Sequence, residues 1–133
     1  TPVSLLDAQA TLFHSTGARR PETWRGRPLP TIPAEDDERV VFSEYHGHGT
    51  RSGAFMVRRG RWKYIHYMAA PHQLFDLAAD PDETEDLAAA RPDVVDDLCL
   101  ALSTICDPDL ENRRAHAFVR AQLETLATRR EDA

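Results

Sequence analysis

Glu44, His46 and His48 alternate along one short stretch of the chain. Successive side chains of a β-strand point to opposite faces, so these three would share one side if a strand continued through Gly47. Imidazoles and carboxylates are zinc ligands, and neutral imidazoles beside a carboxylate also suit proton transfer or contact with a polar substrate. We interpret the three as candidate substrate-binding residues. A metal site, or a solvated loop rich in Gly, Thr and Ser, are the alternatives.

A strand that begins near Arg39 would carry this triplet. Apolar and polar residues alternate there, and Val40 and Phe42 fall on the same face as Glu44. Residues 73–77 have the composition of another strand, bounded by turn-forming residues. The triplet is therefore expected at the end of a strand that belongs to a small sheet.

Two apolar and aromatic runs on either side of Arg59-Gly60 indicate a β-hairpin in this sheet. With these two residues as the turn, Val57 would pair with Trp62 and Phe55 with Tyr64. The four paired side chains would form an apolar layer suited to covering a core. The opposite face of the hairpin is basic, and its charges could either contact an anion or stay solvated.

Helices are predicted on both sides of the strand region. Ser4 and Gly17 are residue types that begin and end helices, and they enclose an expected helix from Leu5 to about Ser15. Residues 19–38 hold four prolines and an acidic run, which predicts an extended connection. These features divide the chain into residues 1–38, a helix with a Pro-rich linker, and residues 39–133.

Three further helices are expected after the sheet. The first is a short helix around residues 85–89, the second runs from Pro92 to about Cys106, and the third continues to Thr128. The last has a narrow apolar stripe that would dock on the sheet or on a partner. The order of elements predicts an α+β fold with a small antiparallel sheet of about four strands, C-terminal helices and one N-terminal helix.

Charge and length limit the classes of function. The 133 residues suffice for one core, and their formal net charge is −6. An acidic chain with one short basic stretch, from Arg51 to Lys63, is a poor nucleic-acid binder, so no nucleic-acid partner is expected. No run approaches the roughly 18 apolar residues of a membrane span. We expect a soluble protein, and no targeting segment decides between a cytoplasmic and a periplasmic location.

Five segments, in this order, resemble sulfatases of the alkaline-phosphatase-like superfamily. They are Val3–Leu12, Gly26–Leu29, Ser43–Tyr45, Met56–Ile65 and Leu74–Glu83. Ala10 stands where the family pattern usually has Pro, and Pro28 where it has Ser. The long final helix is most similar to the choline-sulfatase and phosphonate-monoester-hydrolase branch. The resemblance assigns residues 39–133 to the C-terminal sulfatase subdomain and residues 1–38 to the edge of the catalytic domain.

The resemblance implies a parent enzyme that hydrolyses sulfate esters with a formylglycine and a divalent cation, calcium or magnesium. In the family these belong to the large N-terminal domain, and no such motif occurs here, so neither catalytic residues nor metal ligands are assigned. Cys106-Asp107-Pro108 is similar to the start of the family's Cys-x-Pro-Ser-Arg signature, but Asp109 and Leu110 replace its Ser and Arg. We interpret it as the boundary between two helices.

The resulting hypothesis is a C-terminal part of a sulfatase that is inactive alone. It would pack on the N-terminal catalytic domain and line the mouth of the substrate pocket with Glu44, His46 and His48. Surface normally covered by that domain predicts self-association. Two alternatives stay open: part of a phosphonate or phosphodiester hydrolase of the same superfamily, and a non-enzymatic module that binds a protein through its helices.

Overall fold

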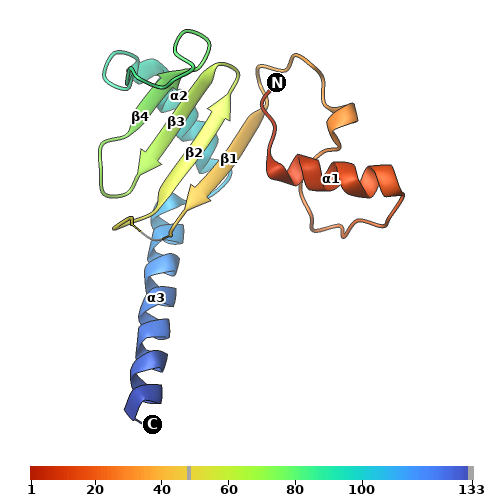
Figure 1. The fold of residues 1–133 in the computed structure, drawn as a ribbon. Coiled ribbons are helices and arrows are strands. Elements are labelled where there is room, and N and C mark those ends of the chain that lie inside the picture. The colour runs from red at the N-terminus through yellow and green to blue at the C-terminus, as the bar shows by residue number, and fades with distance from the viewer. Residues whose placement is uncertain (48, 132–133) are drawn as a thin grey trace.

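The computed structural model describes residues 1–47 and 49–131, with side chains through Thr128. Four strands form one antiparallel sheet in the order β1-β2-β3-β4, and three α-helices accompany it (Figure 1). The predicted α+β class and the four-stranded sheet are confirmed. The elements are α1 (Leu5–Thr16), η1 (Leu29–Thr31), β1 (Val40–Tyr45), β2 (Ala54–Arg59), β3 (Trp62–Tyr67), β4 (Gln73–Asp76), α2 (Pro92–Ser103) and α3 (Pro108–Glu131).

The core lies between one face of the sheet and α2, which crosses behind the sheet in Figure 1. Strand residues on this inner face alternate with residues on the outer face, and α2 presents side chains at helical spacing toward them. Leu98, at the middle of α2, is completely buried. The buried core consists of Phe55, Val57, Tyr64, Leu74, Val94, Leu98 and Leu102.

The hairpin between β2 and β3 differs from its predicted register. Arg59 pairs with Trp62 and Val57 with Tyr64, so the turn residues are Gly60-Arg61. Gly60 has a φ of +53° and takes the first turn position, while Arg59 remains in the strand opposite Val40. The predicted register was therefore wrong by two residues. Because side chains alternate with a period of two, this shift left the predicted apolar face intact.

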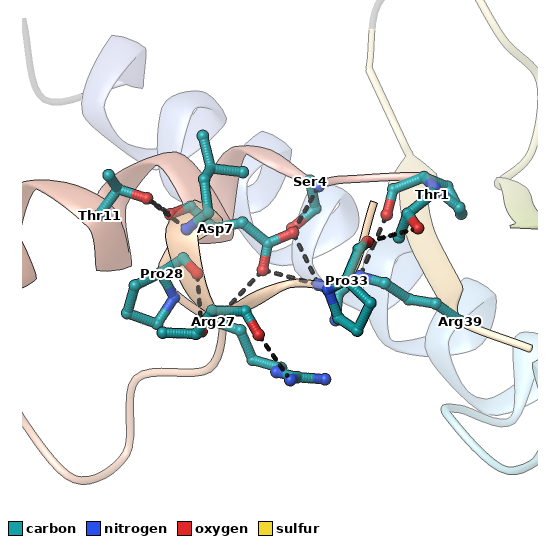
Figure 2. A network of polar contacts seen from close by, with 12 residues as sticks. Thr1, Ser4, Asp7, Thr11, Arg27, Pro28, Pro33 and Arg39 are labelled. Carbon is teal, nitrogen blue, oxygen red and sulfur yellow. Dashed lines mark hydrogen bonds and ion pairs between the residues drawn. The ribbon is translucent and has the colours of Figure 1, made fainter. Parts of the chain in front are cut away.

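An ion pair ties the N-terminal segment to the sheet (Figure 2). The Asp7 carboxylate is buried and accepts hydrogen bonds from the backbone amides of Ser4 and Arg27, both at 2.8 Å. Arg39, just before β1, donates to both Asp7 oxygens at 2.8 Å. Burial alone raises the pKa of Asp7, but these hydrogen bonds outweigh it and hold the pKa below its usual value. Asp7 thus joins α1, the linker and β1.

The predicted start and end of the first helix are confirmed. Ser4 and Asp7 form a capping box at the N-terminus of α1, and Gly17 ends the helix in a left-handed conformation. Gly26 lies against this helix with a φ of +107°, and a Cβ there would come 2.3 Å from the Leu6 carbonyl oxygen. Only glycine permits this approach of the linker to the helix.

The expected helix around residues 85–89 was wrong. This segment forms turns, because its backbone is tied to β4: the amides of Leu74 and Ala88 donate to Asp86 Oδ1, both at 3.0 Å, and the Leu87 amide donates to the Leu74 carbonyl at 2.8 Å. The second predicted helix is shorter than expected, since α2 ends at Ser103.

The third helix extends from the body of the protein, as Figure 1 shows. Its apolar residues beyond the first turns are exposed, with Phe118 at 66% and Leu123 at 62%. Of the two predicted places for this stripe, the sheet is therefore wrong for this part of α3, and docking on a partner stays a prediction. In the described part of the chain, no helix is long and apolar enough to cross a membrane.

Candidate functional site

The sequence candidates lie where β1 ends and α3 begins. Glu44 lies near the end of β1, where it pairs with Phe55 of β2 one position before the last pair of the two strands. The strand ends at Tyr45, one residue before His46, yet His46 Nε2 still lies 3.7 Å from Glu44 Oε2. The structure therefore brings Glu44 and His46 together, as a half-exposed carboxylate and a three-quarters buried imidazole. His48 lies outside the described residues.

Close backbone packing fixes the position of His46. Its ring meets Phe55 edge-on, with the ring centroids 5.3 Å apart. A Cβ on Gly53 would lie only 2.7 Å from His46 Cε1, so the glycine makes room for the imidazole. The Gly53 amide donates to Asn112 Oδ1 on α3 at 2.8 Å. These contacts join the start of β2 to the first turns of α3, with His46 beside the junction.

Glu44 and His46 line one side of a groove along α3, which we call the Glu44 groove. Its volume is about 510 Å³. Across it, Arg114 pairs with Glu111 at 2.9 Å, so the groove carries charges of both signs. Residues of this kind can orient a polar ligand by hydrogen bonds. The groove is lined mainly by Glu44, His46, Glu111, Arg114, Ala115 and Phe118.

Two further histidines, which the sequence did not single out, lie near Phe55, the residue that His46 contacts. His66 in β3 pairs with Phe55, and its ring stacks on that of His72 with centroids 4.1 Å apart. The hydroxyl of Tyr64 lies 3.1 Å from His66 Nδ1. Strand alternation from Tyr64 would have placed His66 on the inner face. His72 belongs to the connection before β4, where alternation predicts nothing.

The pKa of His66 is lowered from its ordinary value. Burial is the main cause and the neighbouring His72 adds to it, whereas Asp109 opposes them. Because the folded protein favours neutral His66, its contribution to stability should be present above pH about 6.5, the ordinary histidine pKa, and be lost as the pH falls through the lower folded pKa. We expect wild type to lose more unfolding free energy between pH 7.5 and 5 than His66→Gln, measured by urea denaturation. Equal losses would contradict this expectation.

Two basic residues of the hairpin, Arg61 and Lys63, form ion pairs within the chain. Lys63 Nζ lies 2.5 Å from Glu83 Oε2, and the Arg61 guanidinium pairs with the carboxylate of Asp76. Hydrogen bonds from Arg61 and from the Ala78 amide, the first being the stronger cause, hold the pKa of Asp76 below its ordinary value despite desolvation. These pairs favour a structural role for Arg61 and Lys63 over contact with an external anion.

The Cys106-Asp107-Pro108 segment forms the boundary between α2 and α3, as predicted. The Asp107 carboxylate accepts a hydrogen bond from the Leu110 amide at 3.1 Å, which is the arrangement of a helix N-cap. Burial, reinforced by the charge of Glu44, raises the pKa of the Cys106 thiol. A raised pKa disfavours the thiolate, so this environment does not activate Cys106 as a nucleophile.

The described residues do not fit a metal site. Among them, no three or more His, Cys, Asp or Glu side chains gather in a way that could hold an ion. Glu44 and His46 form one pair, and His66, whose ring also contacts Phe55 edge-on, stacks on His72. We therefore derive no chemical step through a metal on this part of the chain.

Comparison with known proteins identifies the family. No family model matches the chain. A curated relative, arylsulfatase K of Danio rerio, is 34% identical over 131 residues, which cover 91% of this chain and 25% of the relative. The chain belongs to the sulfatase family. It spans about a quarter of the length of the curated relatives that it matches.

Solved structures of the sulfatase family share its fold. A protein of Bacteroides thetaiotaomicron assigned to the sulfatases is 26% identical, with a TM-score of 0.60, and the match covers 86% of this chain and 25% of that protein. A 2-O GAG sulfatase is also 26% identical, with a TM-score of 0.59, covering 86% and 26% of the two chains. The phosphonate monoester hydrolase of Agrobacterium radiobacter, 21% identical with a TM-score of 0.53, shares the fold alone.

Proposed function

We propose that this chain is the C-terminal subdomain of a sulfatase and that the whole protein hydrolyses sulfate esters. The observation that carries the proposal is the match of 91% of the chain to arylsulfatase K of Danio rerio. The match covers α1, the linker and the sheet alike, so it involves both parts of the chain. Because it spans only a quarter of that relative, the catalytic domain would be the principal partner of this subdomain.

The cofactors of such an enzyme would be held outside this chain. A formylglycine nucleophile and a calcium or magnesium ion would supply the attack on the ester and the stabilisation of its charge. The described residues offer no metal cluster, and Cys106 lies in a helix boundary without the residues of the sulfatase signature. The role left to this subdomain is to support the catalytic domain and to contact the substrate.

Substrate contact is proposed for Glu44 and His46 at the Glu44 groove. The Glu44 side chain is accessible, being 45% exposed, and the less exposed His46 beside it is held in place by Phe55 and Gly53. A carboxylate accepts hydrogen bonds from hydroxyl groups, and an imidazole can donate or accept one. The two would therefore recognise the part of the ester beyond the sulfate. His48 stays a sequence-based candidate for the same role.

The test uses the full protein encoded by the gene. We expect it to hydrolyse a sulfate ester, and the 133-residue chain alone to give no turnover. Glu44→Gln should lower kcat/KM about tenfold or more for a sulfated oligosaccharide, the effect of one lost charge-assisted hydrogen bond. The rate on a small aryl sulfate should change little, because that substrate does not reach the groove.

Glu22→Gln serves as the matched control, since Glu22 is exposed in the linker. Turnover by the isolated chain above a boiled sample would contradict the assignment of catalysis to the missing part. Equal losses on both substrates would contradict substrate contact by Glu44. Higher activity on phosphonate monoesters than on sulfate esters would favour the alternative hydrolase, with which the chain shares its fold.

Self-association of the isolated chain stays a prediction. Its basis is the exposed apolar surface on two helices, which includes Leu5 and Leu12 of α1 and Phe118 and Leu123 of α3. In the whole protein we expect part of this surface to pack against the catalytic domain.

A further inference from the structure

A second hollow lies between the start of β2 and α3, and its lining shares His46 and Ala115 with the Glu44 groove. Its volume is about 230 Å³. One wall consists of residues 50–53 and the other of side chains from residues 115–120 of α3. We call it the cationic pocket, lined chiefly by Thr50, Arg51, Ser52, Ala115, His116 and Arg120.

The charges of this pocket are all of one sign. Arg51 stands on the loop wall and Arg120 on the helix wall, and no carboxylate belongs to the lining. Within the described part of the chain, neither arginine forms an ion pair. The adjoining Glu44 groove, by contrast, contains Glu44 and Glu111. An acidic chain thus presents a local positive hollow, which would attract an anionic group.

The rest of the lining suits a sugar ring. The Ser52 hydroxyl can exchange hydrogen bonds with ring hydroxyls, Thr50 Oγ1 can accept one, and Ala115 and Val119 offer an apolar wall. The volume corresponds to about seven or eight water molecules at roughly 30 Å³ each, enough for a small charged group with part of a sugar ring. Thr50 Oγ1 already lies 3.1 Å from the Gly47 carbonyl oxygen, so this hydroxyl is oriented before a ligand arrives.

The two walls are joined at their base. The Gly53 amide donates to Asn112 Oδ1 at 2.8 Å, and Asn112 lies two turns of helix before Arg120. This bond sets the separation of the loop from α3. A pocket whose walls are fixed before binding loses less entropy on binding.

We propose that the cationic pocket binds the sulfate or carboxylate group of a sugar unit, with Arg51 and Arg120 as its charged contacts. Arginine is suited to this because its planar guanidinium donates two parallel hydrogen bonds to such anions. The choice of a sugar as the carrier of the charge rests on the proposed function. Together with the adjoining Glu44 groove, the pocket would let the subdomain hold a substrate at two points.

The test measures direct binding of a probe to the 133-residue chain. Binding is detected by NMR as chemical-shift changes of backbone amides. The probe is glucose 6-sulfate, with glucose as the uncharged control and sodium sulfate as the free anion. We expect shifts at Gly53 and Ala115 that saturate with glucose 6-sulfate and are absent with glucose. Sulfate alone should bind more weakly, because it lacks the ring.

The double variant Arg51→Gln/Arg120→Gln should weaken the binding of glucose 6-sulfate by about tenfold or more. Arg113→Gln is the matched control, because Arg113 is an exposed arginine on the same helix outside the pocket and its loss should leave the affinity unchanged. Circular dichroism checks that each variant is folded.

Three outcomes would overturn the proposal: no saturable shifts at the pocket, an equal effect of the Arg113 control, or equal affinity for sulfate and glucose 6-sulfate. Binding needs no turnover, so its failure is distinct from a failure of the proposed function. If the whole protein hydrolyses sulfate esters but the 133-residue chain does not bind glucose 6-sulfate, the proposal for the cationic pocket alone is refuted. An inactive whole protein whose C-terminal chain binds the probe would refute the sulfatase activity alone.

Discussion

Replacing Asp7 with alanine should destabilise the N-terminal segment by about 3 kcal/mol, the lower end of the cost of removing one partner from a buried ion pair. The lower end applies because the Arg39 side chain left behind is 13% exposed and keeps some contact with water. The substitution also leaves the amides of Ser4 and Arg27 without their acceptor. One carboxylate is thus the common partner of three separate segments.

The loss should be local to the N-terminal segment. Besides its bonds to Asp7, Arg39 holds the N-terminal segment by donating to the Pro2 carbonyl at 3.1 Å. We therefore expect faster amide hydrogen exchange throughout α1 and the linker in Asp7→Ala, by about a hundredfold for 3 kcal/mol. Amides of β2 and β3 should keep wild-type rates.

Two comparison variants define what Asp7 contributes. Asp7→Asn removes the charge and keeps one oxygen, which can accept only one of the two backbone hydrogen bonds, so it should fall between wild type and alanine. Asp93→Ala breaks the exposed pair with Arg91 and should have little effect. Uniformly faster exchange across the sheet in Asp7→Ala would show that the N-terminal segment and the sheet unfold together, contrary to our expectation.

The pH dependence of this network has a definite sign. The pKa of Asp7 is lower in the folded protein, so its stabilising effect is present above the ordinary aspartate pKa of about 3.9 and is lost as the pH falls through the folded value. His66 becomes charged on protonation, whereas Asp7 becomes neutral, and the stabilising effect of neutral His66 is lost at a higher pH than that of Asp7. Acidification should thus weaken the sheet end near His66 before it weakens the attachment of α1.

Local signals in the sequence predicted the ends of α1 well. Ser4 and Gly17 act through residues three or fewer positions away, so their types were sufficient to predict the ends of α1. The turn at Gly60 was also recognised, but glycine alone does not state which turn position it takes. The two-residue error in register followed from that, whereas the choice of face depended only on alternation.

Contacts between distant segments could not be read in the same way. Asp7 and Arg39 are 32 residues apart, and nothing in their spacing indicates that they meet. The wrong prediction of a helix at residues 85–89 has the same origin. There the Asp86 side chain accepts a hydrogen bond from the Leu74 amide of β4, and the segment does not form a helix. For the candidate site, alternation correctly associated Glu44 with His46 although the strand ended before the histidine. The cationic pocket depends on how α3 lies beside residues 50–53, which no local pattern predicts.

Replacing Leu98 with alanine should lower the free energy of unfolding of the sheet region by about 3 kcal/mol, within the range for large-to-small substitutions in a packed core. Leu98 is completely buried between α2 and the inner face of the sheet. Leu100→Ala is a closely matched control, because Leu100 lies two residues away on the same helix and is 66% exposed. Its effect should stay within about 0.5 kcal/mol. Urea denaturation followed by circular dichroism measures both.

The same pair of variants tests how α3 is held. Cys106, at the end of the connection between α2 and α3, packs against the core that contains Leu98. A loosened α2 should therefore let α3 move, and the Gly53 amide should exchange faster in Leu98→Ala than in Leu100→Ala because its bond to Asn112 depends on that position. Unchanged protection of Gly53 in a destabilised Leu98→Ala would mean that the contacts of Gly53 and His46 hold α3 without help from α2.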